Sequence, residues 1–364
     1  MISKIVTLGD VCNKGSSNIA QKDLVGRDGI YPIYGAAGYI KNVDFAHQDK
    51  PYLAVVKDGA GIGRVMKLPA NSSIIGTMQY ILPKGNIDID YLYFALQYMN
   101  LSKYFSGSTI PHIYFRDYQK EKLPLPELSE QQGKAYVLLR IEQLIECYHQ
   151  QLTKLDELVK SRFVEMFGHQ SHNEKSLPYL TIDDVAEIYL GITHTPTYVD
   201  SGVMFISAKN TSGDFLDLSD VKYISREEFE GAPKGSKPQV NDVLFSRVGS
   251  NLGHPVILEE DLELCTFVSL GFLRTKGKVT SNYLKHWMRD EFFATQVSAH
   301  VKGGGQPNLN TGWLKEFKII VPSIEAQKEF DEFCKQVDKS KLVVQQSLEK
   351  LETLKKSLMQ QYFG

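Results

Sequence analysis

Two short glycine-rich segments carry basic residues at a spacing suited to an anionic ligand. Both follow the pattern basic-x-Gly-x-x-x-Gly, one beginning at Lys57 (KDGAGIGR) and the other at Arg247 (RVGSNLGH). Strand-like residues flank each segment, so each pattern predicts a tight turn that lets the backbone approach a ligand closely. A plain β-turn with no ligand is the alternative. Neither segment has the G-x-G-x-x-G or G-x-x-x-x-G-K-[ST] spacing of nucleotide-binding loops, which disfavours a nucleotide cofactor.

Basic and amide side chains in and near these turns have the chemistry for contacts with nucleic acid. Lysine and arginine bind phosphates and guanine edges, whereas glutamine and asparagine pair with the edge of adenine. Each residue is equally compatible with an ordinary surface position. The candidates are Lys57, Arg64, His112 and Arg116 in the first half of the chain, and Lys209, Arg247, His254, Lys302, Gln306 and Asn308 in the second.

Motifs for catalysis or metal binding are missing from the sequence. It contains no H-E-x-x-H, no G-x-S-x-G and no N-P-P-[FY] tetrad of an adenine methyltransferase. Asp156, Glu157 and Lys160 have the spacing of one solvated helix face. His169 and His172 form an HxxH in a polar linker, where we expect no metal site. The sequence therefore predicts a non-catalytic chain without a cofactor of its own.

Composition is that of a globular protein of two or three domains. The chain has 364 residues and a net charge of −2, with net +4 over residues 1–126 and −4 over residues 169–322. Binding of nucleic acid then requires local basic faces or a basic partner. The beginning of the sequence lacks a signal-peptide core, no segment is apolar enough to span a membrane, and the four cysteines form no CxxC. We therefore expect a cytoplasmic protein with reduced thiols.

The chain contains an internal duplication, which predicts the elements that hold these candidate residues. Residues 123–168 recur as residues 319–364 at a constant offset of 196, so that Pro126 matches Pro322, Gln131 matches Gln327 and Phe167-Gly168 matches Phe363-Gly364. A match over more than forty positions without a gap indicates an internal repeat, and no shorter repeat covers the rest of the chain.

Each copy of the repeat is expected to form one long helix. Ser129 is a candidate cap for the first helix, whose apolar residues recur in steps of three and four. Lys341 and Lys355 interrupt this pattern in the second helix, which predicts a weaker seam. Matching length and register favour an antiparallel pair; each helix of ~39 residues would be a rod of ~58 Å. The apolar positions are Leu138, Ile141, Ile145, Tyr148, Leu152, Leu155 and Val159 in the first helix, and Val337, Val344, Leu348 and Leu351 in the second.

A module of short strands precedes each helix. In the first, strands are predicted at Tyr31–Tyr34, Tyr52–Val56, Arg64–Leu68 and Gln79–Leu82, followed by a helix from Asp90. The second module repeats this plan: a helix over Tyr283–Asp290 answers the Asp90 helix, and the loop KGGGQPNLN takes the place of GSTIPHIYF. This symmetry places the end of the second helix beside the first module.

The duplicated helices, opened by PLPELSEQQ and VPSIEAQKEF and closed by LDELVKSRFVEMFG and LETLKKSLMQQYFG, resemble those of the specificity subunit of type I restriction–modification systems. SRVGSNLGHPVIL and GGGQPNLN also resemble the recognition domains of this family. The resemblance covers the whole chain and implies an α+β fold with two similar target-recognition domains, separated by an antiparallel pair of long coiled-coil helices and related by a pseudo-two-fold repeat. The implied boundaries are 1–125 and 169–321 for the recognition domains, and 126–168 and 322–364 for the helical conserved regions.

The resemblance also implies a function and partners. Each recognition domain would read one half of a bipartite site in double-stranded DNA, and the helices would set the spacer. Two methyltransferase subunits carrying S-adenosylmethionine would dock on the helices, and motor-nuclease subunits using ATP and Mg would join them. Leu152, Leu155, Leu348 and Leu351 are the candidate docking residues. The alternatives are a stand-alone or fused modification system, a cytosolic enzyme of unknown type, and a coiled-coil scaffold.

Overall fold

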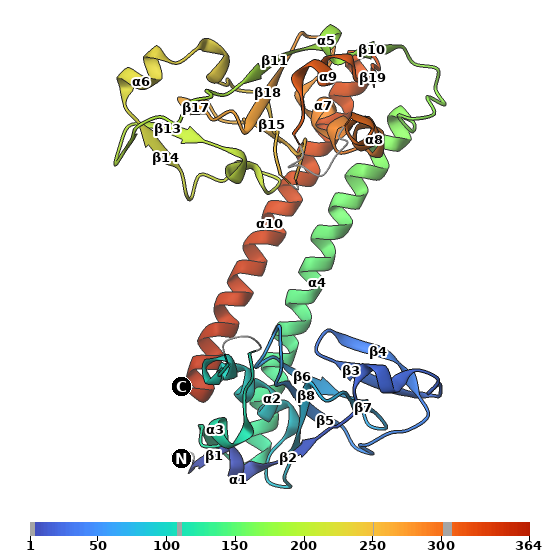
Figure 1. Cartoon of the computed structure of the whole chain (residues 1–364), viewed down its shortest axis with the longest axis vertical. Helices are drawn as coiled ribbons and strands as arrows, with labels where there is room; N and C mark the ends of the chain where they lie inside the picture. The colour runs from blue at the N-terminus through green and yellow to red at the C-terminus, as the bar shows by residue number, and fades with distance from the viewer. Residues whose placement is uncertain (1–3, 108–110, 250, 301–307) are drawn as a thin grey trace. The chain divides into compact units, whose positions relative to one another are not determined.

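The structure is a computed structural model and describes residues 4–107, 111–249, 251–300 and 308–364. The chain forms two compact units (Figure 1). Unit 1 comprises residues 1–151 and 344–364, and unit 2 comprises residues 152–343. Each unit contains one α+β module together with parts of two 40-residue helices, α4 (Leu128–Phe167) and α10 (Ile324–Phe363). No helix within the described residues is long and apolar enough to cross a membrane.

The module of unit 1 is built on a four-stranded antiparallel sheet in the order β2-β8-β5-β6. Helix α2 (Ile89–Tyr98) covers this sheet and begins at Asp88, whose carboxylate accepts the N–H groups of Asp90 and Tyr91. A smaller sheet in the order β4-β3-β7 completes the module. The elements are β1 Lys4–Thr7, α1 Leu8–Val11, β2 Cys12–Ser16, β3 Tyr31–Gly35, β4 Gly38–Val43, β5 Tyr52–Val56, β6 Val65–Leu68, β7 Ser73–Ile74, β8 Met78–Pro83, α3 Phe115–Tyr118 and β9 Lys122–Leu125.

The module of unit 2 repeats this plan, with a main sheet in the order β11-β18-β15-β16 and a second sheet in the order β12-β14-β13-β17. Helix α7 (Ser281–Met288) takes the place of α2. The other elements are β10 Tyr179–Thr181, α5 Ile182–Val185, β11 Ala186–Leu190, β12 Tyr198–Val199, β13 Val203–Ile206, β14 Lys222–Ile224, α6 Arg226–Gly231, β15 Val243–Ser246, β16 Pro255–Ile257, β17 Leu264–Thr266, β18 Leu270–Thr275, α8 Glu291–His300, α9 Thr311–Glu316 and β19 Lys318–Ile320.

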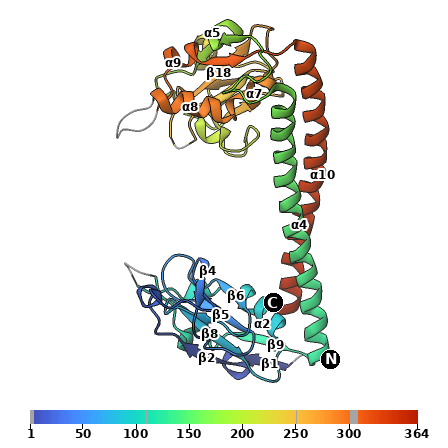
Figure 2. The ribbon, with the colours of Figure 1, turned by 90° about the vertical axis from the view of Figure 1, so that its right-hand side faces the viewer.

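Each long helix ends against the module of the other copy. Phe167, near the end of α4, packs edge-on against Tyr283 of α7 at 4.9 Å between ring centroids. Phe363, at the matching end of α10, lies 5.0 Å from Tyr91 of α2. Both phenylalanines are buried in the core of their unit. The predicted position of the second helix end beside the first module is therefore confirmed. The two chain ends labelled in Figure 2 both belong to unit 1.

The starts of the two helices differ by one capping group. Ser323 precedes α10 and its hydroxyl accepts the N–H of Ala326 at 3.3 Å. The prediction that Ser129 caps the first helix is wrong. Helix α4 begins at Leu128, so Ser129 lies in its first turn, and Glu127 occupies the position that matches Ser323.

The predicted apolar seam is confirmed by burial. Leu138, Ile141 and Val159 of α4 are buried, and the remaining seam positions of that helix are half-buried. In α10, Val337 and Leu348 are buried. Ion pairs show that the helices run antiparallel: Glu142 pairs with Lys355 in unit 1, whereas Asp156 pairs with Lys341 in unit 2.

The same ion pairs show how Lys341 and Lys355 are accommodated in the second seam; the weaker seam itself stays a prediction. The Lys355 ammonium lies 2.6 Å from the Glu142 carboxylate, and Lys341 is paired with Asp156. Both lysine side chains are more than 70% shielded from solvent, at 26% and 15% exposure. The aliphatic part of each lysine side chain therefore packs along the seam, while its ammonium group pairs with a carboxylate of the facing helix.

Candidate nucleic-acid interface

The two glycine-rich segments form equivalent turns. One connects β5 to β6 and the other connects β15 to β16. Gly63 has φ +83° and donates its N–H to Val56 at 2.8 Å, and Gly253 has φ +77° and donates to Ser246 at 2.7 Å. A Cβ at Gly63 would lie 2.5 Å from the backbone nitrogen of Ser102. The second glycine of each pattern is thus required by backbone conformation and close packing.

The turn in each unit is tied to a second loop by the same backbone bond. The N–H of Ile113 donates to the carbonyl of Lys57 at 3.0 Å, and the N–H of Leu309 donates to the carbonyl of Arg247 at 2.8 Å. Ile113 and Leu309 are fully buried and differ by 196 positions. Each module therefore carries one two-loop surface, which we call loop surface 1 and loop surface 2. Residues 108–110 and 301–307 of the second loops lie outside the described residues.

The two loops of loop surface 1 carry Lys57, Arg64, His112 and Arg116. Lys57 lies 3.9 Å from Asp58, which also pairs with His112. Arg64 is exposed, and Arg116 has 74% of its side chain exposed. The two arginines are therefore available to an anionic partner, whereas His112 is oriented by a carboxylate.

Loop surface 2 uses its arginine differently. The Arg247 guanidinium donates to the carbonyls of Val268 at 3.1 Å and Leu309 at 3.3 Å, and to the Asn308 side chain at 3.5 Å. Burial lowers the pKa of Arg247 from its usual value. These contacts hold the second loop against the turn and leave Asn308 exposed at its end.

The other described candidates of unit 2 are His254 and Lys209. His254 is hydrogen-bonded through Nε2 to the carbonyl of Gly213 at 2.8 Å, and Lys209 pairs with Asp220 at 2.7 Å. Lys302 and Gln306 lie outside the described residues. Several of the described candidate residues are thus engaged by the protein itself.

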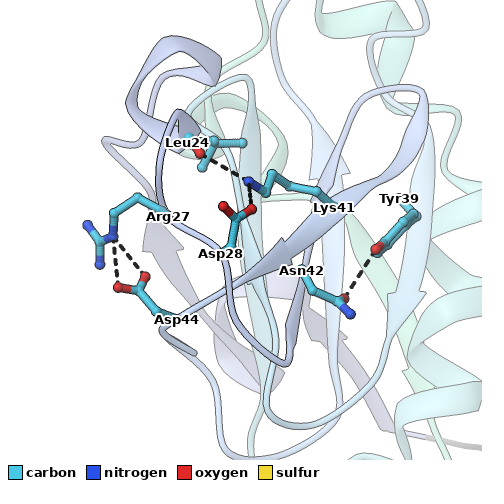
Figure 3. Close-up of polar contacts among 7 residues, drawn as sticks. All are labelled: Leu24, Arg27, Asp28, Tyr39, Lys41, Asn42 and Asp44. Carbon is cyan, nitrogen blue, oxygen red and sulfur yellow. Dashed lines mark hydrogen bonds and ion pairs between the residues drawn. The ribbon is translucent and has the colours of Figure 1, made fainter.

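Two other basic residues of unit 1, Arg27 and Lys41, are paired with carboxylates nearby. Figure 3 shows the segment before β3 tied to β4: Arg27 Nε lies 2.8 and 3.1 Å from the Asp44 carboxylate oxygens, and Lys41 Nζ lies 2.5 Å from Asp28 and 3.3 Å from the carbonyl of Leu24. These pairs fasten the segment to the small sheet. On loop surface 1, by contrast, Arg64 is exposed and Arg116 keeps 74% of its side chain exposed beside Asp117 and Tyr114.

One residue of loop surface 1 was not recognised from the sequence. Tyr114 is 43% exposed, its ring centroid lies 4.1 Å from that of His112, and the Arg116 guanidinium carbon lies 4.7 Å above it. The segment HIYFR, in which apolar and outward-facing residues alternate, could have indicated that Tyr114 is exposed. The interaction of the ring with both neighbours required the structure.

The helix positions proposed for partner docking differ in access. Leu348 is only 8% exposed, and Leu152, Leu155 and Leu351 are half-buried. They therefore belong largely to the helix seam itself. The exposed apolar residues of the helices within unit 1 are Leu128, Tyr136, Val137, Leu144 and Leu354.

Comparison with known protein families identifies the family to which the chain belongs. The model of the type I restriction modification DNA specificity domain matches residues 3–157 and again residues 178–353. The chain belongs to this family. The two matches correspond to the two copies of the duplication, so the α+β fold with two similar recognition modules and a pair of long helices is confirmed.

Individual family members agree over most of the chain. The specificity subunit of the type I restriction enzyme MjaVIII of Methanocaldococcus jannaschii is 23% identical over 322 residues, covering 83% of this chain and 76% of that protein. The EcoBI specificity subunit of Escherichia coli is 23% identical over 252 residues, covering 62% and 53%. The crystal structure of a type I specificity subunit from M. genitalium has the same fold, with a TM-score of 0.65 at 14% identity and coverage of 99% and 96%.

Proposed function

We propose that this chain is the DNA-reading subunit of a type I restriction–modification assembly, and that each module reads one half of a bipartite site. The observation that carries the proposal is the equivalence of loop surfaces 1 and 2, each formed by a glycine turn bonded to a second loop through Lys57 or Arg247. The family match assigns the chain to DNA specificity. Duplicated surfaces with different side chains suit two different half-sites.

The chain acts without chemistry of its own. Its contribution is to position bound DNA for methyltransferase subunits that carry S-adenosylmethionine, and for motor-nuclease subunits that use ATP. Two methyltransferase subunits match the two-fold repeat of the chain. Recognition domains over 1–125 and 169–321 and helical regions over 126–168 and 322–364 are the corresponding functional divisions, and the cytoplasm is the expected compartment.

Exchange of one loop tests modular reading. Residues 302–308 are replaced by those of another family member, while Leu309 and Asn310 are kept because Leu309 is buried and Asn310 caps α9 through the N–H of Gly312 at 2.7 Å. Methylated adenines are then mapped across the genome of a host expressing the complete modification complex. We expect changed bases in one half of the methylated sequence only. Changes in both halves would exclude independent reading by the two modules.

A matched exchange in unit 1 supplies the control. Residues 106–110 precede the buried Ile113 and can be replaced without altering the Ile113–Lys57 bond. This variant should change the opposite half-site. A wild-type complex whose methylation follows no bipartite sequence would overturn the proposed function itself.

A further inference from the structure

The segment from His112 to Arg116 has an inner and an outer side. Ile113 is fully buried and Phe115 is 9% exposed, and both belong to the core of unit 1. His112, Tyr114 and Arg116 alternate with them, and Tyr114 is 43% exposed. The inner residues thus fix the backbone that carries three outward side chains.

The outer side chains hold the Tyr114 ring in place. Its centroid lies 4.1 Å from the His112 ring at an interplanar angle of 51°, and Asp58 pairs with His112 from the glycine turn. On the Tyr114 ring lies the Arg116 guanidinium, at 4.7 Å. Among the described residues, the Arg116 guanidinium has one further contact, 3.6 Å to Asp117, and its side chain is 74% exposed. The exposed guanidinium therefore makes a cation–π contact that a ligand can displace, on an aromatic ring whose position is fixed by its neighbours.

Helix stability does not explain a tyrosine here. Tyr114 occupies the N-cap position of α3 and makes no side-chain capping bond. At the matching position in unit 2, Asn310 caps α9 through its side chain, as N-cap residues commonly do. Helix α3 therefore lacks a side-chain cap, and the residue at its N-cap position exposes an aromatic ring on loop surface 1, which also carries Lys57 and Arg64.

We infer that Tyr114 is a stacking site for a nucleobase that has left the duplex stack. This inference rests on the proposed function. Base faces in a duplex are covered by their neighbours, so an aromatic ring can stack on a base only where a step is opened. Methyltransferases open such a step by flipping the target nucleotide. The base opposite the target then loses its pairing partner, and this is the base that we assign to the Tyr114 ring.

Displacement of the Arg116 guanidinium from the Tyr114 ring by a base is favourable for both the ring and the guanidinium. Stacking of a base on an aromatic side chain is about twofold stronger in free energy than an exposed cation–π contact. The displaced guanidinium gains a charge-assisted bond to a phosphate. In unit 2 the matching positions are Asn308, Asn310 and Gly312, which carry no aromatic ring. Stacking therefore belongs to the half-site read by unit 1.

The test uses the complete complex of this chain with its methyltransferase partner. The probes are duplexes carrying the mapped methylation sequence, with an abasic residue in place of the target adenine in either half. Affinity is measured by fluorescence anisotropy for the wild type and for Tyr114→Leu, Tyr114→Phe and Tyr114→Trp. Tyr39→Ala is the matched control because Tyr39 is 60% exposed and its hydroxyl donates to the side chain of the nearby Asn42 at 3.2 Å.

Tyr114→Leu should weaken binding about 5- to 140-fold when the abasic residue is in the half read by unit 1, the range expected for loss of one stacked base. The phenylalanine and tryptophan variants should bind like the wild type, and Tyr39→Ala should have no effect. No variant should affect the probe with the other half altered. Unchanged binding by Tyr114→Leu, or equal loss in Tyr114→Phe, would overturn the stacking inference while leaving the proposed function intact. A wild-type complex that binds a scrambled duplex equally well would overturn both.

Discussion

Gln131 and Gln327, 196 positions apart, make the same three hydrogen bonds in their respective units. The Gln131 amide donates to the carbonyls of Asn86 and Pro126, and its oxygen accepts the N–H of Asp88 at 2.9 Å. Gln327 donates to Lys278 and Pro322 and accepts from Thr280 at 2.8 Å. Asp88 and Thr280 are the N-cap residues of α2 and α7, so each glutamine joins a long helix to the helix of its module.

Replacement of either glutamine should destabilise its own unit. Gln131→Ala leaves buried backbone groups without partners, and each such group costs about 1–3 kcal/mol. We expect a loss of about 2–4 kcal/mol in unit 1, measured as reduced hydrogen-exchange protection of α2, with unit 2 unchanged. Gln327→Ala should give the reverse. The exposed Gln345 offers a control, since Gln345→Ala should leave both units intact. Equal loss of protection in both units would contradict a local role.

The Lys355–Glu142 pair in the seam should be replaceable by apolar residues. Both side chains are about three-quarters shielded, so removing one leaves a poorly solvated charge, whereas removing both restores an apolar seam. We expect Lys355→Met to reduce the unfolding free energy of unit 1 by about 1 kcal/mol. Adding Glu142→Met should recover that loss. Urea denaturation of the single and double variants measures it, with the exposed Lys350→Met as control. Additive losses in the double variant would show that the two side chains do not interact.

Unit 2 should lose stability as the pH falls below about 6.5. Burial, followed by the charges of Lys285, Arg289 and Lys341, holds the pKa of His286 well below its usual value of 6.5. Below pH 6.5 the unfolded chain therefore binds a proton that the folded unit does not, so folding weakens with decreasing pH. One such histidine gives a slope of at most about 1.4 kcal/mol per pH unit.

Denaturation between pH 5.5 and 7.5 measures this slope. His286→Gln should flatten the profile because the substituted side chain does not titrate. Asp331 affects stability in the opposite direction, because burial chiefly raises its pKa and the folded unit therefore binds its proton more readily than the unfolded chain. This effect lies at lower pH, nearer the usual pKa of an aspartate. An unchanged slope in His286→Gln would assign the pH dependence to another group.

Docking of methyltransferase subunits is better tested on exposed helix positions than on the seam. Leu348→Asp would place a charge in a buried position and disturb the helix pair itself. Leu144 and Leu354 are 47% and 45% exposed in unit 1, so Leu144→Glu and Leu354→Glu should leave the fold intact. We expect the double variant to reduce co-purification with the methyltransferase several-fold. Normal co-purification would place the docking surface elsewhere, and Glu349→Gln, at an exposed position, provides the control.

Periodicity and duplication sufficed to predict the long helices, the repeated modules and the glycine turns. These features depend on local spacing, and the positive φ of Gly63 and Gly253 follows from the turn itself. The engagement of candidate side chains did not follow from the sequence. Arg247 contacts the carbonyl of Leu309, 62 positions away, and Glu142 meets Lys355 across 213 positions. Such pairings depend on how distant segments pack, which a residue pattern does not specify.

The length of the helix pair should set the length of the DNA spacer. Insertion of four residues after Gln150 in α4 and after Gln346 in α10 adds ~6 Å to each helix. Since duplex DNA rises ~3.4 Å per base pair, we expect a spacer longer by about one or two base pairs, with the same bases in both half-sites. A paired insertion of seven residues is the matched variant, because it preserves the heptad register and adds ~10.5 Å, or about three base pairs. Insertion in α4 alone should disturb the seam and abolish methylation. Genome-wide mapping of methylated adenines measures both outcomes; paired insertions that left the spacer unchanged would show that the helices do not determine its length.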